Sequence, residues 1–233
     1  MGDRKGSPDL LWEFYDLLGP RESWAMRPGQ LYSAHVVYAQ HWPTVVQVVN
    51  YDPLDERNSV FRIKPYSEGD ERHYPIHSVG LREDEMWYVY TGKKRLVVVL
   101  GYVESEWLSK DRPQKVLMCA PVFGFQSRHT QEMVIRTQAF DYPNLFYLPP
   151  EPRGCYEESA VRFEMIQPIM KGYLQPFRSP LANKPVVLSD TAYRFLITHL
   201  VNYICGEVVD EQVHEDIRAY RDLLLESLDI FDT

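Results

Sequence analysis

The segment TGKKRLVVVLGYV, residues 91–103, places three consecutive cations, Lys93, Lys94 and Arg95, directly before the aliphatic run Leu96–Leu100. A continuous apolar run of this length predicts a strand that is buried on both faces. The glycine and the cations before it predict a solvated turn. The segment leaves two interpretations of Arg95: a cation that closes a turn, or a cation fixed at a functional site.

The composition sets limits on the fold and on the partners. The chain has 233 residues, 45% of them apolar and 13% aromatic, which suits one elaborated domain or two small ones with a real core. Seventeen prolines and sixteen tyrosines favour short strands and long loops. The net charge of −8 argues against a generally basic nucleic-acid coat, but it leaves room for a local basic groove.

Targeting signals and disulfides are not expected. The N-terminus has no apolar signal-peptide core, and the run Leu96–Leu100 is far too short to cross a bilayer. The three cysteines, Cys119, Cys155 and Cys205, are widely separated and include no CxxC pair. We therefore expect a cytoplasmic, reduced protein.

Hydrophobic periodicity predicts mostly strands until the last third of the chain. We expect strands at 29–39, 44–51, 59–66, 95–103, 115–125, 132–140 and 159–170. The Pro-rich segment 141–158 is expected to be irregular.

Capping residues predict three helices. A short helix opens at Pro8 and Asp9 and ends before Gly19. Ser189 caps a second helix that runs to about Ile204, with Gly206 as its stop, and a third covers 208–228. The expected fold class is mainly β (α+β), a small closed or sandwiched sheet with helices at its ends.

Four segments follow one another in a known order: Gly92–Leu100, Val116–Gly124, Ser159–Met170 and the helix start Leu188–Asp190. Pro28–Tyr32 is similar to the first strand of the same pattern. The order resembles that of the MazF/PemK/Kid toxin endoribonucleases, whose SH3-like barrel is shared with the CcdB toxin. The resemblance covers about half of the chain.

The resemblance implies a domain organisation. The chain, residues 1–233, would be a single elaborated domain with a barrel core at 27–204. An insertion at about 39–91, the N-terminal helix and a C-terminal helical extension at 205–233 would enlarge that core.

The resemblance also implies a function. Members cleave single-stranded RNA without a metal, by attack of a ribose 2′-hydroxyl on the neighbouring phosphate. They act as homodimers within toxin–antitoxin systems, and an antitoxin segment blocks the RNA groove. No cofactor and no membrane partner are implied.

Four residues are the candidates for this chemistry. Arg95 matches the turn arginine of the family and suits the phosphorane charge, because guanidinium is permanently charged and grips phosphate bidentately. Arg162 and Glu164 stand two apart in a predicted strand and so share a face, and Glu164 would be the general base. His129 follows the strand that ends at Phe125 and could act as acid or base.

The sequence departs from the family in ways that bear on cleavage. Leu96 stands where proline follows the arginine, Met165 replaces a glutamine, and Phe123-Gly124 replaces a Thr-Ser pair. Phenylalanine cannot hydrogen-bond a phosphate, although it could stack on a base. The alternative is therefore a catalytically degenerate barrel that serves as a protein- or nucleic-acid-binding module. A different hydrolase site in the N-terminal half has no motif to support it.

Overall fold

The computed structural model describes residues 6, 13–19, 22, 26–38, 44–50, 52, 54–55, 58–66, 88–105 and 114–229. It is mixed α+β, rich in antiparallel strands, with three α-helices in this part of the chain. Contacts between residues separate two compact units, Val36–Lys93 and the remainder. Each unit is described by itself. The single elaborated domain, with its boundaries at 27–204 and 205–233, stays a prediction.

The smaller unit contains a three-stranded antiparallel sheet. Its order is β4 (Val60–Pro65), β3 (Thr44–Asn50) and β5 (Tyr88–Val89). The strands predicted at 44–51 and 59–66 are confirmed. The acidic residues 83–85 lie outside the described residues.

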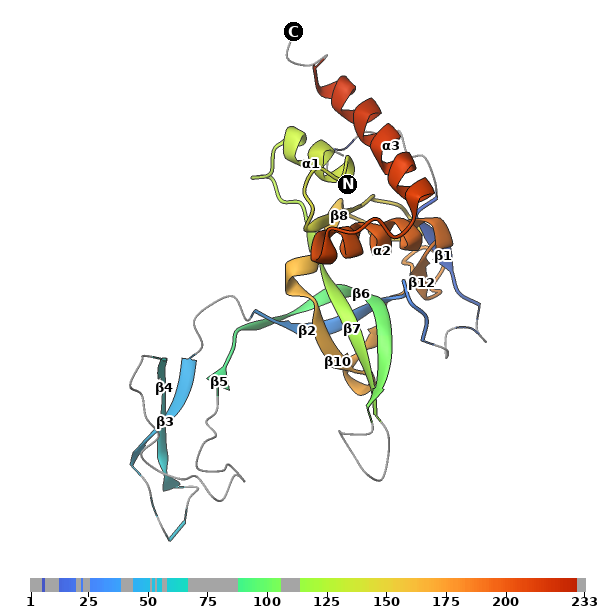
Figure 1. Cartoon of the computed structure of the whole chain (residues 1–233). Helices are drawn as coiled ribbons and strands as arrows, with labels where there is room; N and C mark the ends of the chain where they lie inside the picture. Colours follow the sequence, from blue (N-terminus) through green and yellow to red (C-terminus); the bar gives the residue numbers. More distant parts are fainter. Residues whose placement is uncertain are drawn as a thin grey trace. The chain divides into compact units, whose positions relative to one another are not determined.

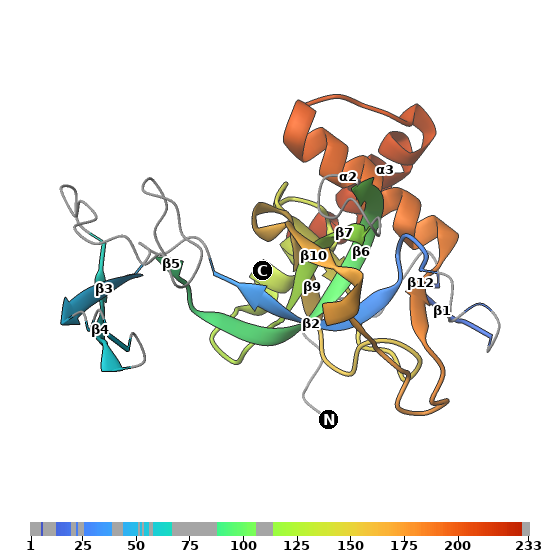
Figure 2. The same ribbon diagram turned by 90° about the horizontal axis from the view of Figure 1, so that it is seen from below.

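The main sheet has seven strands, and Figure 2 shows β2, β6 and β7 as neighbours. Its path runs β11-β2-β6-β7-β9-β8, and β10 also pairs with β7. The bounds are β2 Leu31–Val37, β6 Gly92–Ser105, β7 Gln114–Gly124, β8 Leu145–Leu148, β9 Ser159–Arg162, β10 Gln167–Met170 and β11 Gln175–Pro176. Among the described residues this path does not close, so the expected closed sheet is not formed here.

Strand β6 is the centre of the core. Val97, Val98 and Val99 have no exposed surface, which confirms a strand buried on both faces. The backbone of Val99 exchanges hydrogen bonds with the turn at Gly29 and Gln30, at 2.7 and 3.0 Å. Gly29 has φ +81° there, a conformation that favours glycine.

Strand β7 pairs with two different strands along one edge. Val122 faces Val161 in β9, while Cys119 faces Gln167 in β10. Between these two pairs there are three residue steps along β7 but six along the segment that contains β9 and β10. The three extra residues, Phe163–Met165, coil into the 3-10 helix η3. The strand predicted over 159–170 is therefore wrong at its middle.

The N-terminal helix predicted at 10–18 is also wrong within the described residues. Tyr15–Leu17 forms β1, antiparallel to β12 (Val186–Leu188). Tyr15 is 1% exposed and Asp16 is exposed. Pairing with a strand far away in the sequence has overridden the local capping signal.

The strand predicted at 132–140 is helix α1, Gln131–Gln138. The Thr130 side chain accepts a hydrogen bond from the Met133 N–H at 3.2 Å, which caps the first turn. Glu132 pairs with Arg136 one turn later. The segment predicted to be irregular contains β8.

The C-terminal helices match their predictions. Ser189 caps α2, Asp190–Cys205, and Gly206 ends it at φ 69°. Helix α3 covers Glu211–Asp229, and its side chains Val213, Ile217, Tyr220 and Leu224 are buried. Figure 1 shows α1, α2 and α3 gathered at one end of the larger unit.

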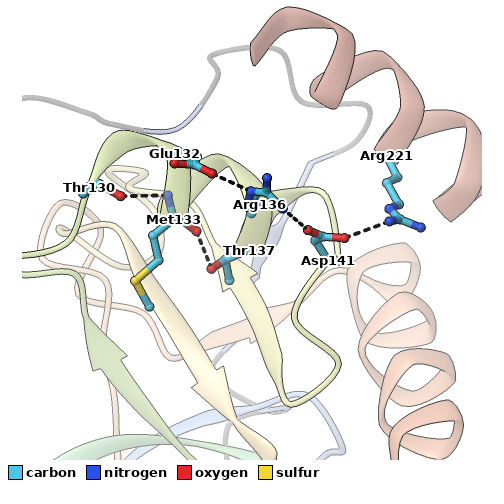
Figure 3. A network of polar contacts seen from close by, with 7 residues as sticks. All are labelled: Thr130, Glu132, Met133, Arg136, Thr137, Asp141 and Arg221. Carbon is cyan, nitrogen blue, oxygen red and sulfur yellow. Dashed lines mark hydrogen bonds and ion pairs between the residues drawn. The ribbon is translucent and has the colours of Figure 1, made fainter. Parts of the chain in front are cut away.

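One carboxylate links α1 to α3. Asp141 accepts from Arg136 at 2.9 Å and from Arg221 at 2.8 Å, as Figure 3 shows. Beneath it, the Gln138 amide donates to the Tyr220 hydroxyl at 2.8 Å. The ion pairs of Asp141 at the surface and the buried hydrogen bond from Gln138 to Tyr220 therefore both hold α3 against α1.

We expect Asp141→Asn to lower the midpoint of urea unfolding, because two guanidinium groups lose their shared carboxylate. The loss should shrink as salt is raised, since the arginines are partly exposed. Glu132→Gln, which removes only the exposed pair with Arg136, is the matched control and should have a smaller effect. Equal effects of the two variants would contradict the link between α1 and α3.

His199 should make stability depend on pH. It is 5% exposed and its Nε2 lies 3.0 Å from the Leu145 carbonyl and 3.2 Å from that of Tyr142. Burial lowers the pKa of His199 below its usual value of 6.5. The unfolded chain then binds the proton more readily, so this contribution is full above about pH 6.5 and is lost as the pH falls toward the folded pKa.

We expect the free energy of unfolding to fall between pH 7.5 and 5.5 by more in the wild type than in His199→Gln. The amide of glutamine can still donate to the carbonyls but does not titrate. Urea unfolding at both pH values measures the difference. The same slope in both proteins would show that His199 is not the titrating group.

Candidate functional site

Arg95 lies inside β6, which begins at Gly92, so the turn predicted before it is strand. Its side chain is half-buried, whereas Lys93 and Lys94 are exposed. The ammonium of Lys94 donates to the Gln175 side chain of β11 at 2.9 Å. The cations of the opening segment thus alternate between sheet faces, and Arg95 is separated from Lys94 by the strand geometry.

Phe123 joins Arg95 to Arg162. The guanidinium carbon of Arg95 lies 4.9 Å from the centre of the Phe123 ring, and that of Arg162 lies at the same distance. These residues stand on β6, β7 and β9, which are consecutive in the sheet. Both distances are within the range of a cation–π interaction.

Glu164 completes the group through Arg162. The Arg162 Nε donates to Glu164 Oε1 at 2.7 Å, and the terminal nitrogen Nη2 donates to the same oxygen. The two side chains are 34% and 19% exposed. The shared strand face predicted from their spacing is wrong, since Glu164 lies in η3, but the 3-10 turn still brings its carboxylate to Arg162.

The other carboxylate oxygen, Oε2 of Glu164, is buried and finds no hydrogen-bond partner among the described residues. Buried polar atoms are rarely left unpaired, and each such case calls for an explanation. The carboxylate therefore keeps one acceptor oxygen that Arg162 does not use.

We call Arg95, Phe123, Arg162 and Glu164 the guanidinium cluster. It carries two formal positive charges and one negative charge, on a chain whose net charge is −8. Glu164 pairs with Arg162, and the cluster as a whole carries one net formal positive charge. The cluster is therefore suited to an anionic group.

His129 occupies the turn between β7 and α1. The Gln126 N–H donates to its Nδ1 at 2.8 Å, and its ring packs edge-on against Phe125 with centres 5.6 Å apart. These contacts fix the ring within its own turn. Its predicted part in the same chemistry stays a prediction.

The sequence predicted the three charged members of the cluster but not the role of Phe123. From the sequence, Phe123 was expected either to lack the hydrogen bond of a hydroxyl group or to stack on a base. Its contact with both arginines follows from strand order, which pattern alone did not supply. The register that places Val97 opposite Pro121 is seen in the structure and had no signal in the sequence.

Other sites offer less chemistry. Burial raises the pKa of Cys119 to about 12 and that of Cys155 to about 11, so neither thiol supplies a thiolate at neutral pH. Within the described ranges no group of three His, Cys, Asp or Glu side chains could hold a metal ion. No helix in this part of the chain is long and apolar enough to cross a membrane.

A cavity of about 320 Å³ lies away from the cluster, beside β1, β12 and the start of α2. Asp16, Glu22 and Asp190 line it together with Arg27, which pairs with Glu22 at 2.9 Å. Its carboxylates are exposed to water. We place the candidate site at the guanidinium cluster, because cation, aromatic ring and carboxylate meet there.

No protein-family model matches the chain, and no curated protein matches it either. The resemblance to the MazF/PemK/Kid group therefore stays a prediction from the residues quoted above.

A double-mutant cycle should find coupling between Arg162 and Glu164. Arg162→Met, Glu164→Gln and the double variant, compared by urea unfolding, should give a coupling energy of about 1 kcal/mol, since the pair is only partly screened by water. The pair Arg194–Asp210, with the arginine 61% exposed, is the control and should couple more weakly. Additive effects at Arg162 and Glu164 would contradict the pairing.

Proposed function

We propose that the chain is a metal-independent endoribonuclease of the MazF/PemK type that cleaves single-stranded RNA. The observation that supports the proposal is the guanidinium cluster, in which two arginines and a carboxylate meet although they come from separate elements. Attack of a 2′-hydroxyl on phosphate needs a cation for the phosphorane charge and a base for the hydroxyl. Arg95 and Glu164 would supply these groups.

The proposed step balances as follows. Glu164 takes the proton of the 2′-hydroxyl, whose oxygen forms a bond to phosphorus while the bond from phosphorus to O5′ breaks. The products are a 2′,3′-cyclic phosphate and a 5′-hydroxyl. The departing O5′ takes up a proton, for which His129 is the predicted donor. Arg162 would hold Glu164, and Arg95 would contact the non-bridging oxygens.

The wider setting is part of the same proposal. We propose that the main sheet is related to an SH3-like barrel of the MazF/PemK type, and that the chain is a cytoplasmic toxin that forms a homodimer and has a cognate antitoxin as its partner. The order of the four matched segments supports this. The open path of the described strands would then be a departure from the barrel.

One observation favours a second candidate, a binding module that has lost cleavage. Phe123-Gly124 replaces a Thr-Ser pair, so two hydroxyl groups that could hydrogen-bond a phosphate are missing. The guanidinium cluster could still bind the RNA backbone electrostatically.

Purified chain should cut a mixed-sequence single-stranded RNA in the presence of EDTA and leave 2′,3′-cyclic phosphate ends. Arg95→Ala and Glu164→Gln should each slow single-turnover cleavage by about 100-fold, as loss of an acid–base or charge-stabilising group typically does. Arg178→Ala is the control, because Arg178 is exposed and donates to the Asn183 backbone. His129→Ala is measured separately to test the proton donor.

The outcomes separate the two candidates. RNA that is bound but left intact, with binding weakened by Arg95→Ala, would favour the binding module. Cleavage that is unchanged in both Arg95→Ala and Glu164→Gln would place the nuclease site elsewhere. A chain that neither binds nor cleaves RNA would exclude both candidates.

A further inference from the structure

We infer that Phe123 is a positioning residue, which holds the guanidinium groups of Arg95 and Arg162 by stacking in place of the missing hydroxyl groups. The role of Phe123 in catalysis rests on the proposed function, but its contacts with the two arginines are present in the free chain. Phe123 would affect catalysis by positioning Arg95 and, through Arg162, Glu164.

The order of the strands supplies the first argument. β7 lies between β6 and β9, so Arg95 and Arg162 reach the Phe123 ring from the two neighbouring strands. Each guanidinium carbon lies 4.9 Å from the ring centre. One aromatic side chain thus fixes two cations that would otherwise repel each other.

The surroundings of the ring supply the second argument. Arginine side chains at the surface lose considerable rotamer freedom when they are held in one position. A half-buried ring between them limits that freedom before any ligand arrives, which is the basis of preorganisation. Phe123 cannot donate or accept a hydrogen bond, so stacking is the contribution its side chain can make.

Two arginines share the surface of the Phe123 ring. Both guanidinium carbons lie 4.9 Å from the ring centre, so a nucleobase would have to compete with them for contact with the ring. The base-stacking interpretation of Phe123 and the positioning interpretation therefore predict different results. Stacking on a base would affect sequence preference, whereas positioning would affect the arginines themselves.

The test compares Phe123→Met and Phe123→Leu, which remove the ring, with Phe123→Tyr, which keeps it. Tyr102→Leu is the matched control, because Tyr102 also carries a cation–π contact between β6 and β7, to Lys115 at 5.1 Å. The first readout is the NMR signals of the arginine Nε–H groups in the free chain, assigned with Arg95→Lys and Arg162→Lys. The second is single-turnover cleavage of RNA, with rate and KM measured separately.

We expect slowly exchanging Nε–H signals for Arg95 and Arg162 in the wild type, in Phe123→Tyr and in Tyr102→Leu. Both ring-removing variants should lose the Arg95 signal, whereas the Arg162 Nε–H, which donates to Glu164, should be affected less. Both should also cleave roughly tenfold to 100-fold more slowly at saturating RNA, because a misplaced group costs rate rather than affinity. Two ring-removing variants are used so that poor folding of one leaves the other to decide.

Three results would overturn the inference. An Arg95 signal unchanged in both Phe123→Met and Phe123→Leu would show that the ring does not hold this arginine. Equal loss in Phe123→Tyr would show that packing, and not the aromatic ring, is responsible. A changed base preference with unchanged arginine signals would favour base stacking. If the wild type does not cleave RNA, the proposed function fails, and the NMR readout still decides the positioning role.

Discussion

Strand β7 pairs with both β9 and β10 along one edge, and this double pairing determines the arrangement of the residues around it. Its central residues pair with β6 in the buried core, while its other edge is shared by β9 and β10 in registers that differ by three residues. Pro121 lies between the two ladders, where a proline could not donate to either. The excess residues form η3, and η3 carries Glu164 toward Arg162. A requirement of sheet pairing thus places a carboxylate beside a cation.

The same sheet explains why the cluster has an aromatic residue at its centre. Arg95 and Arg162 come from strands on either side of β7, so the β7 side chain between them decides how close two positive charges can lie. A hydroxyl in that position would leave each guanidinium to find its own partner. The ring of Phe123 contacts both guanidinium groups, and the Glu164 carboxylate pairs with that of Arg162.

Local signals in the sequence predicted those parts of the fold that local forces determine. The cap at Ser189, the stop at Gly206 and the buried run at Val97–Val99 are confirmed, since each depends on nearby residues. Pairing between distant segments overrode a local signal at Tyr15–Leu17, which became a strand because β12 pairs with it. Helix α1 replaced a predicted strand for a local reason, the cap that Thr130 provides for its first turn. Arg95, Arg162 and Glu164 were predicted together, but their meeting at Phe123 required knowledge of strand order.

Charge limits how such a cluster could recognise RNA. With a net charge of −8, the chain as a whole does not attract a polyanion from a distance, in contrast to a basic nucleic-acid-binding domain. The guanidinium cluster has one net formal positive charge, and screening confines its field to about 8–10 Å at physiological salt. Affinity would have to arise from contacts made after encounter, where the position of each guanidinium matters more than their number. When long-range attraction is weak, a side chain that fixes two guanidinium groups before RNA binds contributes most to those contacts.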